Sequence, residues 1–273
     1  MPKKEFGTAA VDVDEEGVVD LDSLRDAVRD DTAIVSVMAA NNETGVIQPL
    51  GAVSSVALAA RPGPVTVHTD AVAAAPWLHL PVVTASVDMV SLCAHKLGGP
   101  VNSGALVLRG DVGLDPVQPG GGQERGLRGG TVDVAAAVGL AAAVRATHRE
   151  LTEVNDRMLE LQAKLIAALS YLPGAEITSR GVARVPGTVH VTFEGLLSDE
   201  LLFLLDDAGV AASAAASCSS GAGEPSHVLA AMGVAPERAR GSVRLSMGSE
   251  TTAADVDAVI SAMSSVVHRL RAN

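Results

Sequence analysis

The chain has 273 residues, 48% of them hydrophobic, and a formal net charge of −12 at neutral pH. This acidic balance argues against direct nucleic-acid binding, because phosphate contacts need clustered Lys and Arg. The longest uncharged stretch, 71–87, is interrupted by Pro76 and Pro81, so no membrane span is expected. Cys93 and Cys218 lie far apart, which argues against a disulfide framework and favours a reducing, cytoplasmic location.

The first half of the chain alternates apolar strand patterns with helical patterns. Strands are predicted over 33–38, 65–68, 87–92 and 104–108, and helices over 21–30 and 53–60. Strands separated by helices imply βαβ units and a mainly parallel sheet with flanking helices. Because functional residues gather where such strands end, we expect Asn42, Asp70 and Lys96 to share one crevice.

The second half is interpreted as a smaller α+β domain. A helical pattern runs from 132 to about 172 and ends at Pro173-Gly174. Later strands are predicted over 187–193 and 242–247, and later helices over 200–207 and 253–270. The predicted fold class is α/β, with a large domain over 1–150 and a small C-terminal domain over 151–273.

Lys96 follows His95 at the end of an apolar run and precedes a glycine-rich turn. A lysine in this place would be partly desolvated, which favours the neutral amine that attacks a carbonyl. An ordinary surface lysine before a turn fits this short stretch equally well.

A glycine-rich segment over 120–131 interrupts the alternation of strands and helices. It contains Arg125, Arg128 and Thr131 and precedes a helical pattern, which is typical of a loop that contacts phosphate. A flexible connection is the alternative interpretation.

Two further residues indicate chemistry in the second half. Cys218 lies among Ala, Ser and Gly residues before a capped helix, the setting of an exposed and reactive thiol. A small packing residue is the alternative. Arg244 lies within a short apolar strand, where its desolvation is costly unless it meets an anion. A substrate carboxylate or an internal carboxylate could be that anion.

Together, these motifs resemble those of the cysteine desulfurases in the class V aminotransferase group, which are pyridoxal phosphate (PLP) enzymes of fold type I. The motifs occur in the family's order between Asp20 and about Asp257. They are Asn41-Asn42-Glu43 with Gly45, His68-Thr69-Asp70-Ala71, Ala94-His95-Lys96 with Gly99-Pro100, Gly121-Gly122 with Glu124-Arg125-Gly126 and Thr131, Cys218 with Glu224-Pro225-Ser226, and Val243-Arg244. The resemblance implies removal of sulfur from L-cysteine, giving L-alanine and an enzyme-bound persulfide.

The same resemblance implies which residues hold the cofactor. Lys96 would form the Schiff base with PLP and act in catalysis, and Asp70 would pair with the ring nitrogen. Asn42 would lie near the ring hydroxyl, and His95 and Cys93 would contact the phosphate.

Substrate and partner roles follow from the resemblance in the same way. Cys218 would be the catalytic nucleophile, and Arg244 with Asn42 would bind L-cysteine. Thr131 would reach the phosphate in the neighbouring subunit of a homodimer. The sulfur acceptor would be an iron–sulfur scaffold or a tRNA-thiolation enzyme, and no metal site is expected.

The sequence departs from the family pattern in three places. The family has a longer N-terminal part, so the large domain is expected to be incomplete and to leave an unpaired sheet edge. Ala73 stands where the family usually has glutamine, and Cys93 where it usually has serine. A truncated or degenerate homologue that only binds partners or dimerises is therefore one alternative. A selenocysteine lyase or another class V enzyme is a second alternative.

Overall fold

A computed structural model describes residues 7–60, 63, 65–110, 112–214 and 226–272. By compactness the chain divides into two units, which we describe separately. Unit 1 comprises Met1–Arg29, Ala40–Pro49 and Thr152–Asn273, and unit 2 comprises Asp30–Ala39 and Leu50–Leu151. The predicted domain division at residue 150 stays a prediction. The long helix α4 (Val134–Leu169) contributes its first half to unit 2 and its second half to unit 1.

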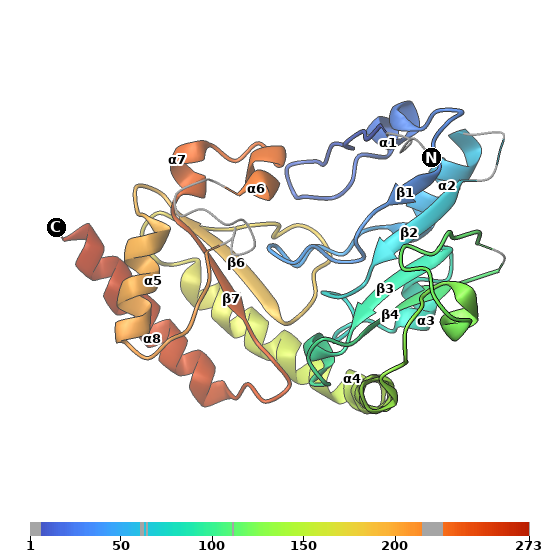
Figure 1. Cartoon of the computed structure of the whole chain (residues 1–273). Helices are drawn as coiled ribbons and strands as arrows, with labels where there is room; N and C mark the ends of the chain where they lie inside the picture. Colours follow the sequence, from blue (N-terminus) through green and yellow to red (C-terminus); the bar gives the residue numbers. More distant parts are fainter. Residues whose placement is uncertain (1–6, 61–62, 64, 111, 215–225, 273) are drawn as a thin grey trace. The chain divides into compact units, whose positions relative to one another are not determined.

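Unit 2 is built on a four-stranded sheet in the order β1-β2-β3-β4 (Figure 1). Its strands are β1 (Ile34–Ser36), β2 (Thr66–Asp70), β3 (Met89–Cys93) and β4 (Gly104–Leu108). Its helices besides α4 are α2 (Leu50–Ala60), α3 (Leu80–Val83) and the 3-10 turns η1 (His95–Leu97) and η2 (Gln123–Gly126). The first three strands are parallel and β4 is antiparallel. The predicted α/β class with a mainly parallel sheet is confirmed.

The alternation of side chains along β2 gives the sheet of unit 2 two different faces. Val67 and Thr69 are buried, whereas Thr66, His68 and Asp70 are half-buried on the opposite face. Helix α2 packs on β2 and buries Leu50, Val53 and Ala57. Burial of the two larger side chains, Leu50 and Val53, contributes roughly 1.5–3 kcal/mol each. One face of the sheet therefore packs against α2, and the opposite face presents half-buried polar side chains that can bind a ligand.

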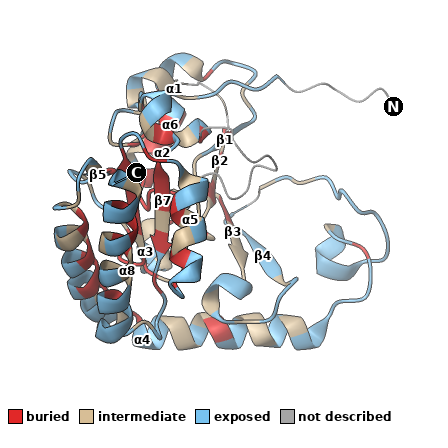
Figure 2. Cartoon of the chain, turned by 90° about the vertical axis from the view of Figure 1, so that its left-hand side faces the viewer, coloured by how far each residue is buried: buried red, intermediate tan, exposed pale blue. Residues whose placement is uncertain are grey.

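The edge strand β4 is exposed although its sequence is apolar. Figure 2 shows β4 in pale blue beside β3, whose first two residues are buried and whose last three are half-buried. Leu106 and Val107 point to opposite faces, yet 48% and 49% of their surfaces are exposed. Among the described residues, β1 and β4 each pair with one strand only, so both form sheet edges. The unpaired edge expected from a shorter N-terminal part stays a prediction, because every open sheet has two edges.

Unit 1 contains a three-stranded antiparallel sheet in the order β5-β6-β7. The strands are β5 (Ala175–Ile177), β6 (Thr188–Phe193) and β7 (Ser242–Ser246). The helices besides α4 are α1 (Leu21–Ala27), α5 (Ser198–Asp207), α6 (His227–Ala231), α7 (Pro236–Ala239) and α8 (Ala253–Arg271). Along β6, Val189, Val191 and Phe193 are buried on one face, and helix α5 packs against both β7 and α8.

Local signals explain where most helices begin. The Asp20 side chain accepts backbone hydrogen bonds from Asp22 and Ser23 at the start of α1, and Thr252 and Asp255 form a capping box at α8. The strand predicted over 104–108 has the same bounds in the structure. The helix predicted over 21–30 is shorter and ends at Ala27. No described helix is long and apolar enough to cross a membrane.

Candidate functional site

The polar face of the unit 2 sheet brings together five side chains from three strands. Ser36 is opposite His68 in the register of β1 and β2, and Asp70 is opposite Ser91 in that of β2 and β3. Cys93 follows Ser91 by two residues and shares its face. Because β2 and β3 are parallel, Asp70 and Cys93 both lie at carboxyl ends of strands, where α/β sheets bind ligands.

His68 is the centre of a hydrogen-bonded row on this face. Its Nδ1 is 2.7 Å from Ser36 Oγ, and its Nε2 is 2.8 Å from Ser91 Oγ. Burial lowers the pKa of His68, and the negative charge of Asp70 opposes this shift. A neutral imidazole donates from one nitrogen and accepts at the other, so hydroxyl partners on both sides fix its orientation.

Asp70 is held by the backbone and keeps its carboxylate available. Its Oδ1 accepts a 2.8 Å hydrogen bond from the Val72 N–H, and its carbonyl oxygen accepts one from Ala39. A carboxylate has about four lone-pair sites, so it can accept further donors. A half-buried carboxylate at a strand end can accept a hydrogen bond from the protonated ring nitrogen of a cofactor such as PLP.

Lys96 lies in η1, directly after β3. Gly98 ends this turn with a φ of 73°, a conformation that favours glycine, and the Gly99 N–H donates to the Ala94 carbonyl at 2.9 Å. The sequence predicted a partly desolvated lysine, but Lys96 is exposed in the structure. The physical reason is that η1 leaves the sheet after buried Ala94 and carries the lysine beyond the strand end.

Cys93 and His95 lie close together beside Lys96. Cys93 Sγ is 3.6 Å from His95 Nε2, and the cysteine is a half-buried free thiol. The structure therefore brings together the two side chains that the resemblance assigns to the cofactor phosphate. A thiol is a weak hydrogen-bond donor. Cys93 and His95 therefore bind an anion less strongly than a serine and a histidine would.

The glycine-rich segment forms a closed loop in unit 2. Gln118 and Arg128 form a bridge, and the Gly129 N–H donates to the Gln118 carbonyl at 2.9 Å. A Cβ on Gly129 would lie 2.7 Å from the Gly120 Cα, so both chains of the loop need glycine here. Thr131 follows the loop and is exposed.

In unit 1, Arg244 contacts the turn that contains Asn42. Arg244 Nη1 donates to the Asn42 carbonyl oxygen at 3.0 Å. Asn41 Oδ1 closes the turn by accepting the N–H groups of Glu43 and Thr44, at 2.8 and 3.0 Å. Sequence reasoning expected an anion beside Arg244; the hydrogen bond in the structure goes to a backbone carbonyl, and the nearby Glu43 carboxyl also interacts electrostatically with the guanidinium.

Glu43 is buried in the same turn, with 4% of its surface exposed. Its Oε2 accepts a hydrogen bond from Ser226 Oγ at 2.5 Å. Burial raises the pKa of Glu43, while the Ser226 hydrogen bond and the charges of His227 and Arg244 oppose this shift. A negative carboxylate near Arg244 contributes to the electrostatics around its guanidinium.

The predicted site residues therefore fall into two clusters. Asp70, Cys93, His95 and Lys96 belong to unit 2 with Thr131, and Asn42 contacts Arg244 within unit 1. The single crevice expected for Asn42, Asp70 and Lys96 stays a prediction. Cys218 lies outside the described residues.

Sequence reasoning assigned no role to several residues of these clusters. The spacing of Thr66, His68 and Asp70 on alternate positions of β2 was a signal for the polar face. Nothing local indicates that Glu43 binds Ser226, because 183 residues separate them.

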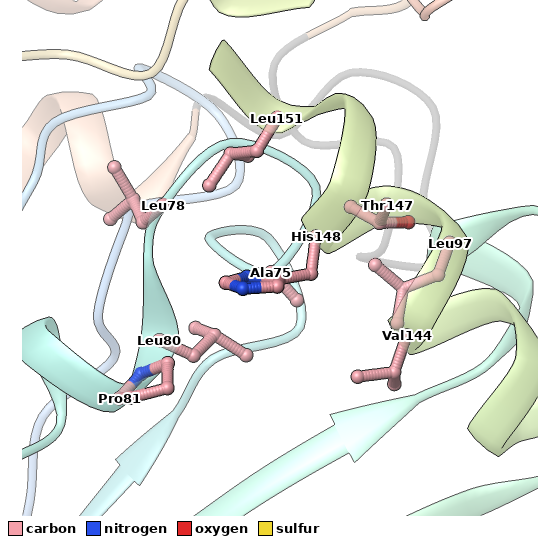
Figure 3. Close-up of a pocket in the computed structure, with 9 residues that line it drawn as sticks. All are labelled: Ala75, Leu78, Leu80, Pro81, Leu97, Val144, Thr147, His148 and Leu151. Carbon is pink, nitrogen blue, oxygen red and sulfur yellow. The ribbon is translucent and has the colours of Figure 1, made fainter.

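A separate apolar pocket of about 170 Å³ opens in unit 2 (Figure 3). Leu78, Leu80 and Leu97 line it with His148 of α4, whose ring centroid is 4.9 Å from that of His79. PLP and free amino acids carry several charges, and this largely apolar lining offers few groups to bind them. We therefore assign the candidate site to the polar clusters.

Comparison with known proteins identifies the family of this chain. The family model described as aminotransferase class-V matches residues 4–259. A cysteine desulfurase IscS of Methanosarcina thermophila is 40% identical over 97% of this chain and 65% of that relative. An IscS-like cysteine desulfurase of Mycobacterium tuberculosis is 41% identical over 94% of this chain and 65% of that relative.

Solved structures show the same likeness. A structure titled as a NifS-like protein has a TM-score of 0.87 at 35% identity, covering 99% of this chain and 70% of that one. The NifS-like protein from Rickettsia africae has a TM-score of 0.83 at 28% identity, covering 94% and 69%.

The chain thus belongs to the aminotransferase class-V family. Within that family, the relatives reported above carry the name cysteine desulfurase, and the chain spans about 65% of their length.

Proposed function

We propose that this chain carries out the PLP-dependent removal of sulfur from L-cysteine, giving L-alanine and a persulfide on the enzyme. The observation that carries the proposal is the placement of Asp70 and Cys93 at adjacent parallel strand ends, with Lys96 three residues after Cys93. The chain's membership of the aminotransferase class-V family supports the proposal, and so does its similarity to a relative named a cysteine desulfurase.

The residues of unit 2 fit the cofactor at its ring. The Asp70 carboxylate would accept a hydrogen bond from the protonated ring nitrogen, the Lys96 amine would attach the cofactor, and Cys93 with His95 would face its phosphate. When bound, PLP supplies an electron sink for bond breaking next to the substrate amine. The exposed amine of Lys96 is accessible for this role.

The other residues act on the substrate itself. The Arg244 guanidinium would bind the cysteine carboxylate through the N–H donors that the Asn42 carbonyl leaves open. Once the Lys96 amine is released from the cofactor, it would accept and return the proton on the α-carbon of the substrate. The Cys218 thiolate would attack the substrate sulfur and hold it as a persulfide.

Partners and location belong to the same proposal. The persulfide sulfur would pass to an acceptor protein, an iron–sulfur scaffold or a tRNA-thiolation enzyme. A reduced cytosolic environment is supported by the wide sequence separation of Cys93 and Cys218, the two cysteines of the chain, which argues against a disulfide framework. A homodimer is supported by exposed apolar side chains of unit 2, among them Val101 at 73% exposure and Val107.

The deciding experiment incubates the purified chain with PLP, L-cysteine and dithiothreitol, which reduces the persulfide and releases its outer sulfur as sulfide, and it measures alanine and sulfide. Lys96→Ala should abolish both products, and Lys164→Ala, an exposed lysine paired with Asp257, is its matched control. Cys218→Ala should prevent alanine formation as well as persulfide. Unchanged alanine release by Cys218→Ala would refute the persulfide role, and no product from the unaltered chain would refute the activity.

The binding-only homologue is a second candidate, favoured by Cys93 and Ala73 in place of polar residues of the family. It predicts self-association without alanine or sulfide release. Sedimentation of the chain with and without Val107→Glu tests the dimer, because a charge on this exposed apolar strand should weaken association. Replacing L-cysteine by selenocysteine in the activity assay tests the selenocysteine lyase alternative, which predicts alanine release from selenocysteine and not from L-cysteine.

A further inference from the structure

Four residues form a continuous row across the unit 1 sheet. His190 of β6 is directly opposite Arg244 of β7. On one side the Thr178 N–H donates to the His190 carbonyl at 3.0 Å, and on the other side Ser213 forms a bridge with Arg244. Residues directly opposite each other in antiparallel strands present their side chains on the same face. The imidazole of His190 and the guanidinium of Arg244 are therefore neighbours.

Each of these two neighbours has a buried polar atom that lacks a partner. His190 is completely buried, and its Nδ1 is 2.7 Å from Thr178 Oγ1. Its Nε2 and the Nε of Arg244 are both buried without a hydrogen-bond partner among the described residues. One atom can accept a hydrogen bond and the other must donate one. Buried polar groups that stay unpaired are costly, so these two atoms complement each other.

We propose that His190 is the positioning residue for Arg244, and that its Nε2 accepts the Arg244 Nε–H when the guanidinium binds a carboxylate. This inference rests on the proposed function for the identity of that carboxylate, the one of L-cysteine. With Nη1 held by the Asn42 carbonyl and Nε held by His190, two contacts fix the guanidinium plane. The remaining N–H donors are then aimed at the substrate, and less rotamer freedom is lost on binding.

The charge state of His190 supports this role. Burial, and secondly the positive charge of Arg244, lower the pKa of His190 to about 4. The imidazole is therefore neutral at neutral pH, and it does not repel the guanidinium. With its proton on Nδ1 and donated to Thr178 Oγ1, the buried Nε2 keeps a lone pair that can accept a hydrogen bond.

Nuclear magnetic resonance of the full chain with ¹⁵N-labelled arginine tests the contact directly. The Arg244 Nε–H signal, assigned by its loss in Arg244→Lys, should exchange slowly with water when L-alanine is added as a carboxylate probe. His190→Leu should speed this exchange, whereas His190→Gln should keep it slow because its amide oxygen can reach the position of Nε2. Fast exchange in both the unaltered chain and His190→Gln would overturn the proposal even if His190→Leu failed to fold.

Kinetics provide a second and independent measurement. His190→Leu should raise the KM for L-cysteine roughly tenfold, the effect of one hydrogen bond to a charged group, and change kcat less. His190→Gln should restore the KM, and His268→Leu, an exposed histidine of α8, is the matched control. An unchanged KM in His190→Leu would overturn the proposal. If Arg244→Lys left L-alanine binding unchanged, the assigned role of Arg244 would fail, whereas the exchange experiment would still decide the contact with His190.

Discussion

The hydroxyl of Ser226 donates a 2.5 Å hydrogen bond to the buried carboxylate of Glu43, although 183 positions separate the two residues. The same hydroxyl accepts the N–H groups of Val228 and Leu229 and so caps α6. Glu43 belongs to the turn whose Asn42 carbonyl binds Arg244. One serine therefore connects the start of α6 to the turn that supports the proposed substrate-binding arginine.

Ser226→Ala should lower the free energy of unfolding by about 2–3 kcal/mol, because it removes a helix cap and leaves a buried carboxylate without its donor. Urea denaturation measures this loss. Thr252→Ala, which removes the exposed cap of α8, is the matched control and should cost only about 1 kcal/mol. In a Glu43→Gln background the cost of Ser226→Ala should decrease, because a neutral amide tolerates the loss better. If Ser226→Ala and Thr252→Ala lowered the free energy of unfolding equally, the hydrogen bond to Glu43 would add nothing to the stability that the cap provides.

His190 should make the stability of the fold depend on pH. Its pKa is lowered from 6.5 to about 4 in the folded chain, so between these values the unfolded chain binds a proton that the folded chain does not. Stability is complete above pH 6.5 and decreases as the pH falls toward 4, by up to about 3 kcal/mol. The pKa of His68 is also lowered, which acts in the same direction.

Urea denaturation at several pH values, compared between the unaltered chain and His190→Gln, isolates the contribution of His190. The difference in unfolding free energy between the two chains should shrink as the pH falls through this range. A difference that does not change with pH would contradict a neutral, buried His190.

Local sequence patterns predicted much of the secondary structure. The strand at Gly104–Leu108 and the long helix at Val134–Leu169 follow from apolar runs and periodicity that a short window contains. Helix α1 ends at Ala27, before the predicted end at 30, because Val28 is already extended with φ −77° and ψ 124°. Sequence signals are weakest at helix ends.

The contacts that build the clusters could not be predicted in this way. The partner of His190 depends on the register of β6 against β7, which brings together positions 54 residues apart. Lys96 appeared partly buried from the apolar run before it, but the 3-10 turn that exposes it is decided by Gly98 and by packing after the strand. Sequence patterns therefore located the reactive residue types, and tertiary pairing determined their neighbours.

Cys93→Ser should strengthen PLP binding, by up to about tenfold, because a hydroxyl is a better donor to phosphate than a thiol. The prediction rests on the proposed contact of this position with the phosphate, beside His95. Titration with PLP, followed by the absorbance of the bound cofactor, measures the affinity. Cys93→Ala is the control that removes the thiol without adding a donor, and it should bind no better than the unaltered chain. Equal affinities of the serine and alanine variants would place the phosphate elsewhere.

Gly139→Ala should destabilise unit 2, although alanine is the better helix former. A Cβ at Gly139 of α4 would collide with the ring of Pro100, approaching its Cδ to 2.9 Å, and Gly99 already lies against Ala143 of the same helix. The turn after Lys96 thus packs on α4 through two glycines, and overpacking should cost about 1–3 kcal/mol. Gly51→Ala in α2 is the matched control, because its Cβ would meet no atom within 4 Å, and it should stabilise the fold by up to about 1 kcal/mol. Thermal denaturation of the two variants should therefore show shifts of opposite sign. If both substitutions raised the melting temperature, the gain in helix propensity would outweigh the collision with Pro100. The close packing of the turn after Lys96 against α4 would then be contradicted.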